Sequence, residues 1–145
     1  MKTAFRRAAV LLAVLVPAVT LGAVPAHAAT ATLSLPYSGC QDSTGRNYDY
    51  VMRVHATSTR SYPDGGWIVV RVWGDDPSSD DLLLGPLTWS FEFWSGGAFL
   101  DMCVNRGTLN EDIGGDEIYA GVRFFDARTG QQAEVVESNR IYGSF

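Results

Sequence analysis

The chain has 145 residues, 46% of them hydrophobic, and its 16 acidic and 11 basic side chains give a formal net charge of −5. This length is typical of a single domain. The acidic balance argues against a nucleic-acid partner, because phosphate contacts need positive charge, and against electrostatic attraction to an anionic membrane.

The first 28 residues have the pattern of a secretory signal peptide. Three basic residues, ending at Arg7, precede an apolar run over 8–16 that is too short to span a bilayer as a helix. The Ala-His-Ala triplet at 26–28 is typical of a cleavage site, so we predict a signal peptide over 1–28 and one secreted domain over 29–145. An uncleaved membrane anchor is the alternative, although no stretch within 29–145 is long and apolar enough to cross a membrane.

Cleavage at this point would make the remaining chain more acidic. The single lysine and two of the ten arginines lie in the first 28 residues. The other 117 residues carry 8 arginines and 16 acidic side chains, which gives a net charge of −8.

Two cysteines, Cys40 and Cys103, lie in the predicted secreted domain. In an oxidising compartment such a pair most often forms one structural disulfide, and we predict that bond here. Closing a loop of about 60 residues would stabilise the fold by roughly 4 kcal/mol in the chain-entropy model. A reactive thiol and a metal ligand are the alternatives, but no Cys-x-x-Cys motif supports them.

Apolar and polar residues alternate through most of 29–145, which predicts strands rather than helices. Seven strands are expected, over residues 31–35, 48–58, 67–73, 87–94, 98–104, 118–125 and 131–136, the last resuming near Ile141. Their number and length favour an all-β fold, an antiparallel β-sandwich that is immunoglobulin-like or of related topology. A small barrel is the alternative.

Glycine-containing turns are expected to join consecutive strands, at 63–66, 95–97 and 126–130. If consecutive strands run antiparallel across the sandwich, the first, third and fifth connections between strands lie at one end. That end would receive both Cys40 and Cys103, as a disulfide requires.

The same three connections hold many of the acidic residues. The first contains Asp42, and the third and fifth contain the candidate metal ligands Asp75, Asp76, Asp80, Asp81 and Asp112. Carboxylates gathered without lysines repel one another, and a hard cation such as Ca²⁺ relieves that repulsion. The sequence therefore predicts Ca²⁺ as the one candidate cofactor. The alternative is that these aspartates are ordinary turn residues.

Residues 72–85, which read VWGDDPSSDDLLLG, resemble the calcium-loop segment of C2 domains. The resemblance implies an eight-stranded sandwich that binds Ca²⁺ at one end, with Asp76 and Asp81 as ligands. Gly74 stands where C2 domains usually carry another ligand aspartate. The segment also resembles the aspartate-rich loop of secreted transthyretin-like proteins, which implies no metal site. C2-like and transthyretin-like topologies therefore join the expected sandwich types.

An aromatic surface is the second candidate site. If Ile68 and its alternate neighbours face the core, then Trp67, Arg71 and Trp73 point away from it. Exposed tryptophans with a nearby arginine are suited to stacking on sugar rings or to anchoring a protein partner. The alternative is that loops or the other sheet cover them.

Catalysis has little support in the sequence. The single histidine of the predicted domain, His55, is the one candidate general base, and no Gly-x-Ser-x-Gly nucleophile motif occurs. We therefore predict a secreted, non-enzymatic binding module with an extracellular ligand, a glycan or a protein. A calcium-stabilised domain, an inhibitor-type module that uses the aromatic surface and a small hydrolase are its competing versions.

Overall fold

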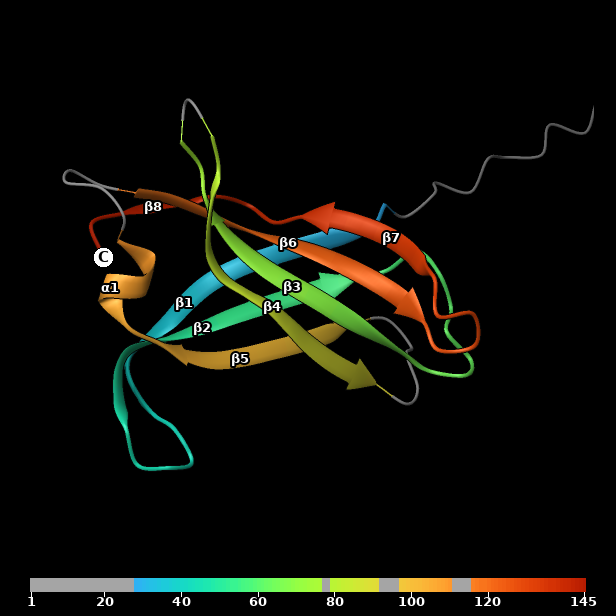
Figure 1. The fold of residues 1–145 in the computed structure, drawn as a ribbon, viewed down its shortest axis with the longest axis horizontal. Helices are drawn as coiled ribbons and strands as arrows, with labels where there is room; N and C mark the ends of the chain where they lie inside the picture. Colours follow the sequence, from blue (N-terminus) through green and yellow to red (C-terminus); the bar gives the residue numbers. More distant parts are fainter. Residues whose placement is uncertain (1–27, 77–78, 92–96, 111–115) are drawn as a thin grey trace, which may run out of the picture.

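The computed structural model describes residues 28–76, 79–91, 97–110 and 116–145, with only the backbone of Phe91. These residues form two antiparallel sheets packed face to face as a sandwich (Figure 1). The all-β sandwich prediction is thereby confirmed. The predicted signal peptide, residues 1–28, lies outside the described residues except for Ala28.

The described residues form eight strands and one short helix. One sheet has the order β1-β2-β5, and the other has the order β4-β3-β6-β7, with β8 also pairing with β6. The elements are β1 (Thr30–Gln41), β2 (Asn47–Thr57), β3 (Gly66–Gly74), β4 (Asp81–Phe91), β5 (Ala98–Val104), α1 (Arg106–Leu109), β6 (Asp116–Asp126), β7 (Gln132–Glu137) and β8 (Ile141–Gly143). In this part of the chain no helix is long and apolar enough to span a bilayer.

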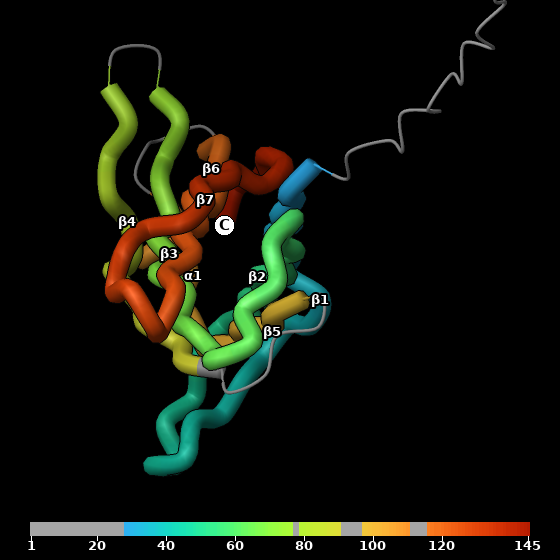
Figure 2. Tube along the Cα trace, turned by 90° about the vertical axis from the view of Figure 1, so that its right-hand side faces the viewer, coloured from blue at the N-terminus to red at the C-terminus, as the bar shows by residue number. Residues whose placement is uncertain are grey.

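The core lies between the two sheets, as the alternation of apolar residues predicts (Figure 2). Its fully buried side chains come from both layers: Met52 and Val54 on β2, Ile68, Val70 and Val72 on β3, and Ile118, Val122 and Phe124 on β6. Burying each such side chain contributes about 1.5–3 kcal/mol. Trp89 departs from the pattern, because its position pairs with inward-facing Ile68 and yet the side chain is 52% exposed.

Two strands are longer than the sequence predicts. The first was expected to end at residue 35, but β1 continues to Gln41, and its register with β2 shifts between Ser34 and Tyr37, on either side of Pro36. The bulge lets the strand continue past a residue that cannot donate a backbone hydrogen bond. As a result Cys40 lies within a strand and not in a connecting loop.

The fourth strand was expected to begin at residue 87, but β4 already begins at Asp81 and pairs with the end of β3. Within β4, Gly85 interrupts the apolar pattern and has a φ of 110°. The register of β4 with β3 shifts on either side of Gly85, between Leu84 and Leu87. A Cβ on Gly85 would lie 2.7 Å from the carbonyl oxygen of Val70. The predicted aspartate-rich loop is therefore in large part a β-hairpin.

The three predicted turns fall between consecutive strands, but two of these connections lead from one sheet to the other. The turn at 126–130 does join the paired strands β6 and β7. The turn at 63–66 leads from β2 to β3, and the connection containing 95–97 leads from β4 to β5, and each links strands of different sheets. Alternating apolar residues look alike on both sheets, because both face one core, so the sequence pattern does not show where the chain changes sheet.

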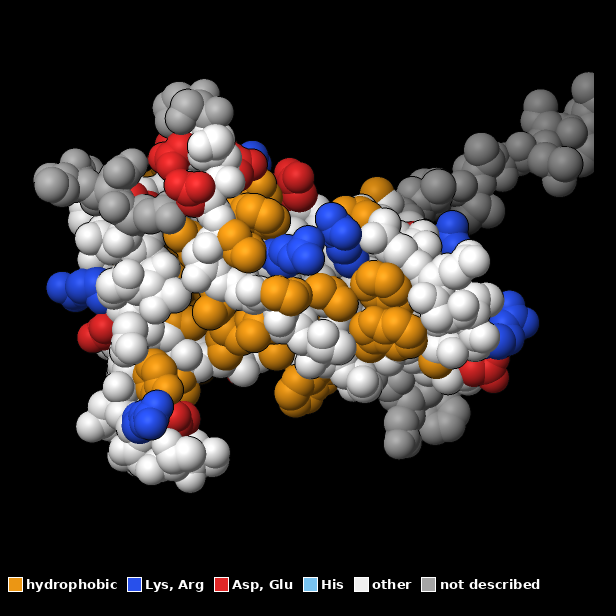
Figure 3. Space-filling view, viewed as in Figure 1, with side chains coloured by type: hydrophobic (Ala, Val, Ile, Leu, Met, Phe, Trp, Pro, Cys, Tyr) orange, Lys and Arg blue, Asp and Glu red, His pale blue; other side chains and the backbone are white. Residues whose placement is uncertain are grey.

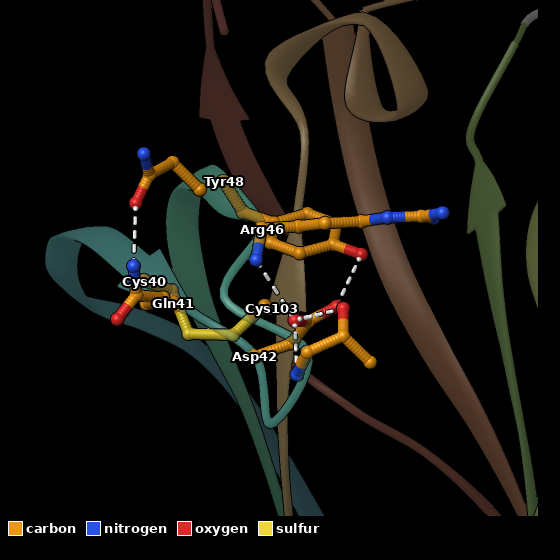
Figure 4. The surroundings of a disulfide bond; sticks show 8 residues. Cys40, Gln41, Asp42, Arg46, Tyr48 and Cys103 are labelled. Carbon is orange, nitrogen blue, oxygen red and sulfur yellow. Dashed lines mark hydrogen bonds between the residues drawn. A yellow bond between two sulfur atoms is a disulfide. The ribbon is translucent and has the colours of Figure 1, made fainter.

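The first and third acidic connections lie toward the same end of the sandwich, on the left in Figure 1, but they do not gather into one cluster. The β1–β2 and β3–β4 hairpins project in opposite directions, downward and upward in both views (Figures 1 and 2). Asp42 is therefore far from the aspartates of the β3–β4 hairpin. The predicted disulfide is confirmed, because Cys40 on β1 is bonded to Cys103 on β5, with a Cα–Cα distance of 5.5 Å (Figure 4).

Side-chain hydrogen bonds join the two sheets at their borders. The Glu134 carboxylate on β7 accepts hydrogen bonds from the hydroxyls of Ser58 and Thr59, which follow β2. The carboxamide of Asn139 accepts from the backbone N–H of Leu33 on β1 at 2.9 Å and donates to the carbonyl of the same residue at 3.2 Å. These bonds fix the position of one sheet on the other.

Candidate functional site

A groove crosses the outer face of the five-stranded sheet, over β3, β6 and β7. It has a volume of about 190 Å³ and is centred on Gly121 of β6, which lies opposite Arg71 on β3 and opposite Glu137 on β7. We call it the Gly121 groove, and its lining consists of Val69, Arg71, Trp73, Tyr119, Gly121, Arg123, Val135 and Glu137. Figure 3 shows basic side chains among hydrophobic ones in the middle of this face, with acidic side chains gathered above them.

The groove exists because its central residue has no side chain. A Cβ on Gly121 would lie 3.4 Å from Nε1 of Trp73, whose indole forms one wall. Glycine in the interior of a strand lowers stability by roughly 0.5–1 kcal/mol relative to alanine and often marks a close approach of another group. The indole of Trp73 makes that approach here, and the remaining space is open to solvent.

Two of the eight described arginines form ion pairs with described residues, and the two arginines of the groove are among the six that do not. Arg53 pairs with Asp101 through two hydrogen bonds of 2.7 and 2.6 Å, and Arg140 pairs with Asp75. Arg71 and Arg123 take part in no ion pair with any described residue. The Nε atom of Arg71 is buried and has no hydrogen-bond partner. An unpaired buried donor costs about 1–3 kcal/mol.

Tyr119 closes the groove at the end nearest the β3–β4 hairpin. Its side chain is buried, and its hydroxyl donates a hydrogen bond of 2.7 Å to Oδ2 of Asp80. Burial, followed by the hydrogen bond to Asp80, raises the pKa of Tyr119 to about 12. The guanidinium of Arg140 lies over the ring, 4.8 Å from its centroid. The hydrogen bond to Asp75 raises the pKa of Arg140, which therefore stays charged.

These contacts account for two of the five predicted metal ligands. Asp75 pairs with Arg140 and Asp80 accepts from Tyr119, while Asp81 is exposed at the start of β4 and Asp76 is half-buried after β3. Asp112 lies outside the described residues. Within the described part of the chain, no group of three or more His, Cys, Asp or Glu side chains is arranged to hold a metal ion. The calcium site stays a prediction.

The three residues of the predicted aromatic surface all lie on the outer face, half-buried. Arg71 and Trp73 line the Gly121 groove. Trp67 does not, because its ring stacks on that of Phe125, with centroids 5.2 Å apart and planes 4° from parallel. The face therefore holds a groove with arginines at its centre and a stacked aromatic pair beyond it.

Most of the groove was not predicted from the sequence. Arg123 alternates with the buried residues Val122 and Phe124, so its outward orientation follows from the same pattern that predicts the strand. Gly121, inside the same strand, is a second signal. What the pattern does not contain is the pairing of β3 with β6, which places these residues beside Arg71.

A second hollow, of about 480 Å³, lies beside the disulfide. Its polar groups are already paired: the Asp42 carboxylate accepts hydrogen bonds from Thr44, from the backbone N–H of Arg46 and from the Tyr48 hydroxyl (Figure 4). The bond from Thr44 is the main cause of the lowered pKa of Asp42. Asp101, also in its lining, is paired with Arg53. This hollow offers a ligand fewer free donors than the Gly121 groove does.

His55 lies on the outer face of the three-stranded sheet, far from any catalytic arrangement in the described part of the protein. Its ring stacks on Phe99, with centroids 4.1 Å apart and planes 6° from parallel, and its imidazole makes no hydrogen bond to a described residue. Packing against an exposed aromatic ring explains the residue without a role in proton transfer.

No family model, no curated protein and no solved structure matches the chain. The local likeness of residues 72–85 to C2 and transthyretin-like loops stays a prediction.

Proposed function

We propose that this protein is an exported, non-enzymatic binding module that holds an anionic group of an extracellular ligand in the Gly121 groove. The observation that carries the proposal is that two arginines, Arg71 and Arg123, line one open groove and make no ion pair with any described residue.

Arginine is the side chain best suited to this task. Its planar fork of donors matches the two oxygens of a carboxylate, and it stays charged at any physiological pH. The chain as a whole carries a net charge of −5, and yet this groove brings together two arginines that make no ion pair with any described residue.

The groove supports binding better than catalysis. The arginines of its lining stay protonated, so Tyr119 and Glu137 are the two side chains there that could transfer a proton. The Tyr119 hydroxyl already donates to Asp80, and its raised pKa of about 12 makes it a poor acid or base near neutral pH. Glu137 alone, without a second acid or a nucleophile in the lining, does not make a hydrolytic pair.

A titration with a simple carboxylate tests the proposal. Acetate, added at constant ionic strength to the ¹⁵N-labelled protein, should shift the backbone amide signals of Arg71, Gly121 and Arg123, whereas neutral acetamide should not. Replacing Arg71 by methionine should abolish the shifts. The matched control is Arg128→Met, which removes one positive charge from the exposed turn between β6 and β7. Acetate shifts that are equal in both variants, or that map to another surface, would contradict the proposal.

A further inference from the structure

We infer that the anionic group held in the Gly121 groove is the single carboxylate of an aspartate or glutamate side chain, presented by a protein partner that docks on the outer face of the five-stranded sheet. This inference rests on the proposed function and names the ligand of the same groove.

The surroundings of the arginines favour a protein surface. Val135 lines the groove and is 55% exposed, and Leu82 on β4, which lies opposite Trp73, is 46% exposed. A complex is stabilised when an apolar surface of the partner covers exposed aliphatic side chains. The same side chains offer no hydrogen bond to the hydroxyls of a sugar. Tryptophan and arginine are enriched at the hot spots of protein interfaces, and the exposed valine and leucine beside them extend the apolar surface around them.

The aromatic rings are less available to a sugar than the sequence suggests. Binding of sugar rings by stacking needs open ring faces. Trp67 has one face covered by Phe125, the ring of Tyr119 lies under Arg140, and the indole of Trp73 lies against the backbone of Gly121. Each ring therefore acts as a wall or a support of the face more than as an open platform.

The charges around the groove select a ligand of low charge. Glu137 lies across Gly121 from Arg71, and its exposed carboxylate opposes additional negative charge in the groove. Asp75 and Asp80 lie at the end closed by Tyr119. A single carboxylate is attracted by two guanidinium groups and repelled by these carboxylates. A ligand with many sulfate or phosphate groups carries more negative charge, so the carboxylates repel it more strongly. A volume of about 190 Å³ is suited to one side chain.

The test uses three probes on the ¹⁵N-labelled protein: the blocked peptide Ac-Val-Glu-Val-NH₂, its glutamine counterpart of the same size, and methyl glucuronide as a carboxylate on a sugar. We expect the glutamate peptide to shift the amide signals of Arg71, Gly121 and Arg123. It should bind at least tenfold more tightly than the glutamine peptide, because a hydrogen bond to a charged group contributes a factor of this order. It should also bind more tightly than methyl glucuronide, because its valines add apolar contacts with the face. Saturating shifts and their midpoint give the affinity.

Variants separate a change of the groove from a change of the fold. Arg71→Met and Arg123→Met should each weaken the glutamate peptide about tenfold, and the control Arg128→Met should not. Gly121→Ala should also weaken binding of the glutamate peptide. Its methyl group would fill the centre of the groove, in ordinary van der Waals contact with Trp73. The amide spectra of all four variants show whether the fold is retained, and thermal melts give their stability.

The outcomes distinguish the inference from the proposed function. If methyl glucuronide binds the groove more tightly than the glutamate peptide, the ligand is a glycan and the inference is overturned, while the proposed function stands. Equal binding of the glutamate and glutamine peptides overturns the role given to charge. If no probe shifts the signals of the groove at millimolar concentration, both the inference and the proposed function fail.

Discussion

Asn139 shows how much one side chain contributes to holding the two sheets together. Its carboxamide makes two hydrogen bonds to the backbone of Leu33, one as acceptor and one as donor. It thereby satisfies the N–H and carbonyl groups of a strand at the border of its sheet, where no further strand is available to do so.

Asn139→Ala should lower the free energy of unfolding by about 1–3 kcal/mol, because the backbone groups of Leu33 lose their partners. Urea denaturation measures this as a lower midpoint with an unchanged slope. Asn110→Ala, at an exposed residue after α1, is the control. Equal midpoints for the two variants would show that the bonds to Leu33 contribute nothing.

The Tyr119 hydroxyl gives the protein a dependence on alkaline pH. Its pKa is raised from 10.0 to about 12 in the folded state, so the folded protein holds this proton more tightly than the unfolded chain does. The stability that results is complete below about pH 10 and is lost as the pH rises through about 12. Tyr62 acts in the same direction, because burial raises its pKa as well.

Tyr119→Phe should therefore flatten the fall in stability between pH 10 and pH 12 without abolishing it. Thermal melts at half-unit steps of pH measure this, together with the absorbance of tyrosinate. Tyr142→Phe is the control, since that side chain is 66% exposed. A pH profile that changes equally in both variants would contradict the role given to Tyr119.

At the scale of the elements, the hairpin of β3 and β4 depends on Gly85. The φ of 110° and the 2.7 Å approach of its missing Cβ to the Val70 carbonyl exclude a side chain at this position. Gly85→Ala should destabilise the protein by about 1–3 kcal/mol, the usual range for backbone strain. Gly107→Ala, within α1 and with nothing within 4 Å of its Cβ position, should be neutral or slightly stabilising. Chemical denaturation of both variants provides the comparison, and similar losses would contradict the argument.

The strands themselves could be predicted well, and their partners could not. Alternation identifies which residues of β3 and β6 face the core, because burial acts on every second residue. Pro36 and Gly85 hid the true extent of β1 and β4, because both residues usually end a strand and here sit at shifts of register. The choice of sheet for each strand depends on contacts between residues distant in sequence, which no local pattern contains.

The candidate site shows the same limit. The outward orientation of Arg71 and Trp73 follows from the sequence, whereas the groove needs β6 to lie beside β3 and β7 beside β6. The charge state of the acidic cluster could not be predicted from the sequence for a related reason. Asp75 pairs with Arg140, 65 residues away in the chain, so a cluster that looks unpaired in sequence is partly neutralised in space.

For the whole molecule, the disulfide is the strongest single constraint on the unfolded chain. It links residues 63 positions apart, and in the chain-entropy model a loop of this length is worth about 4 kcal/mol. The double variant Cys40→Ser and Cys103→Ser should lose stability of this order, measured by urea denaturation. Reduction of the parent protein should match it. A loss much below 2 kcal/mol would indicate that the unfolded chain is already held compact by other means.

The position of the same bond also sets an order of events during synthesis. Cys40 lies next to the last residue of the first strand, but its partner is made only after β3 and β4, which belong to the other sheet. Until then the hairpin of β1 and β2 has no covalent link to the rest of its own sheet, and β6, β7 and β8 of the opposite layer are still to be made. The disulfide therefore cannot precede the synthesis of β5, the strand that pairs with β2.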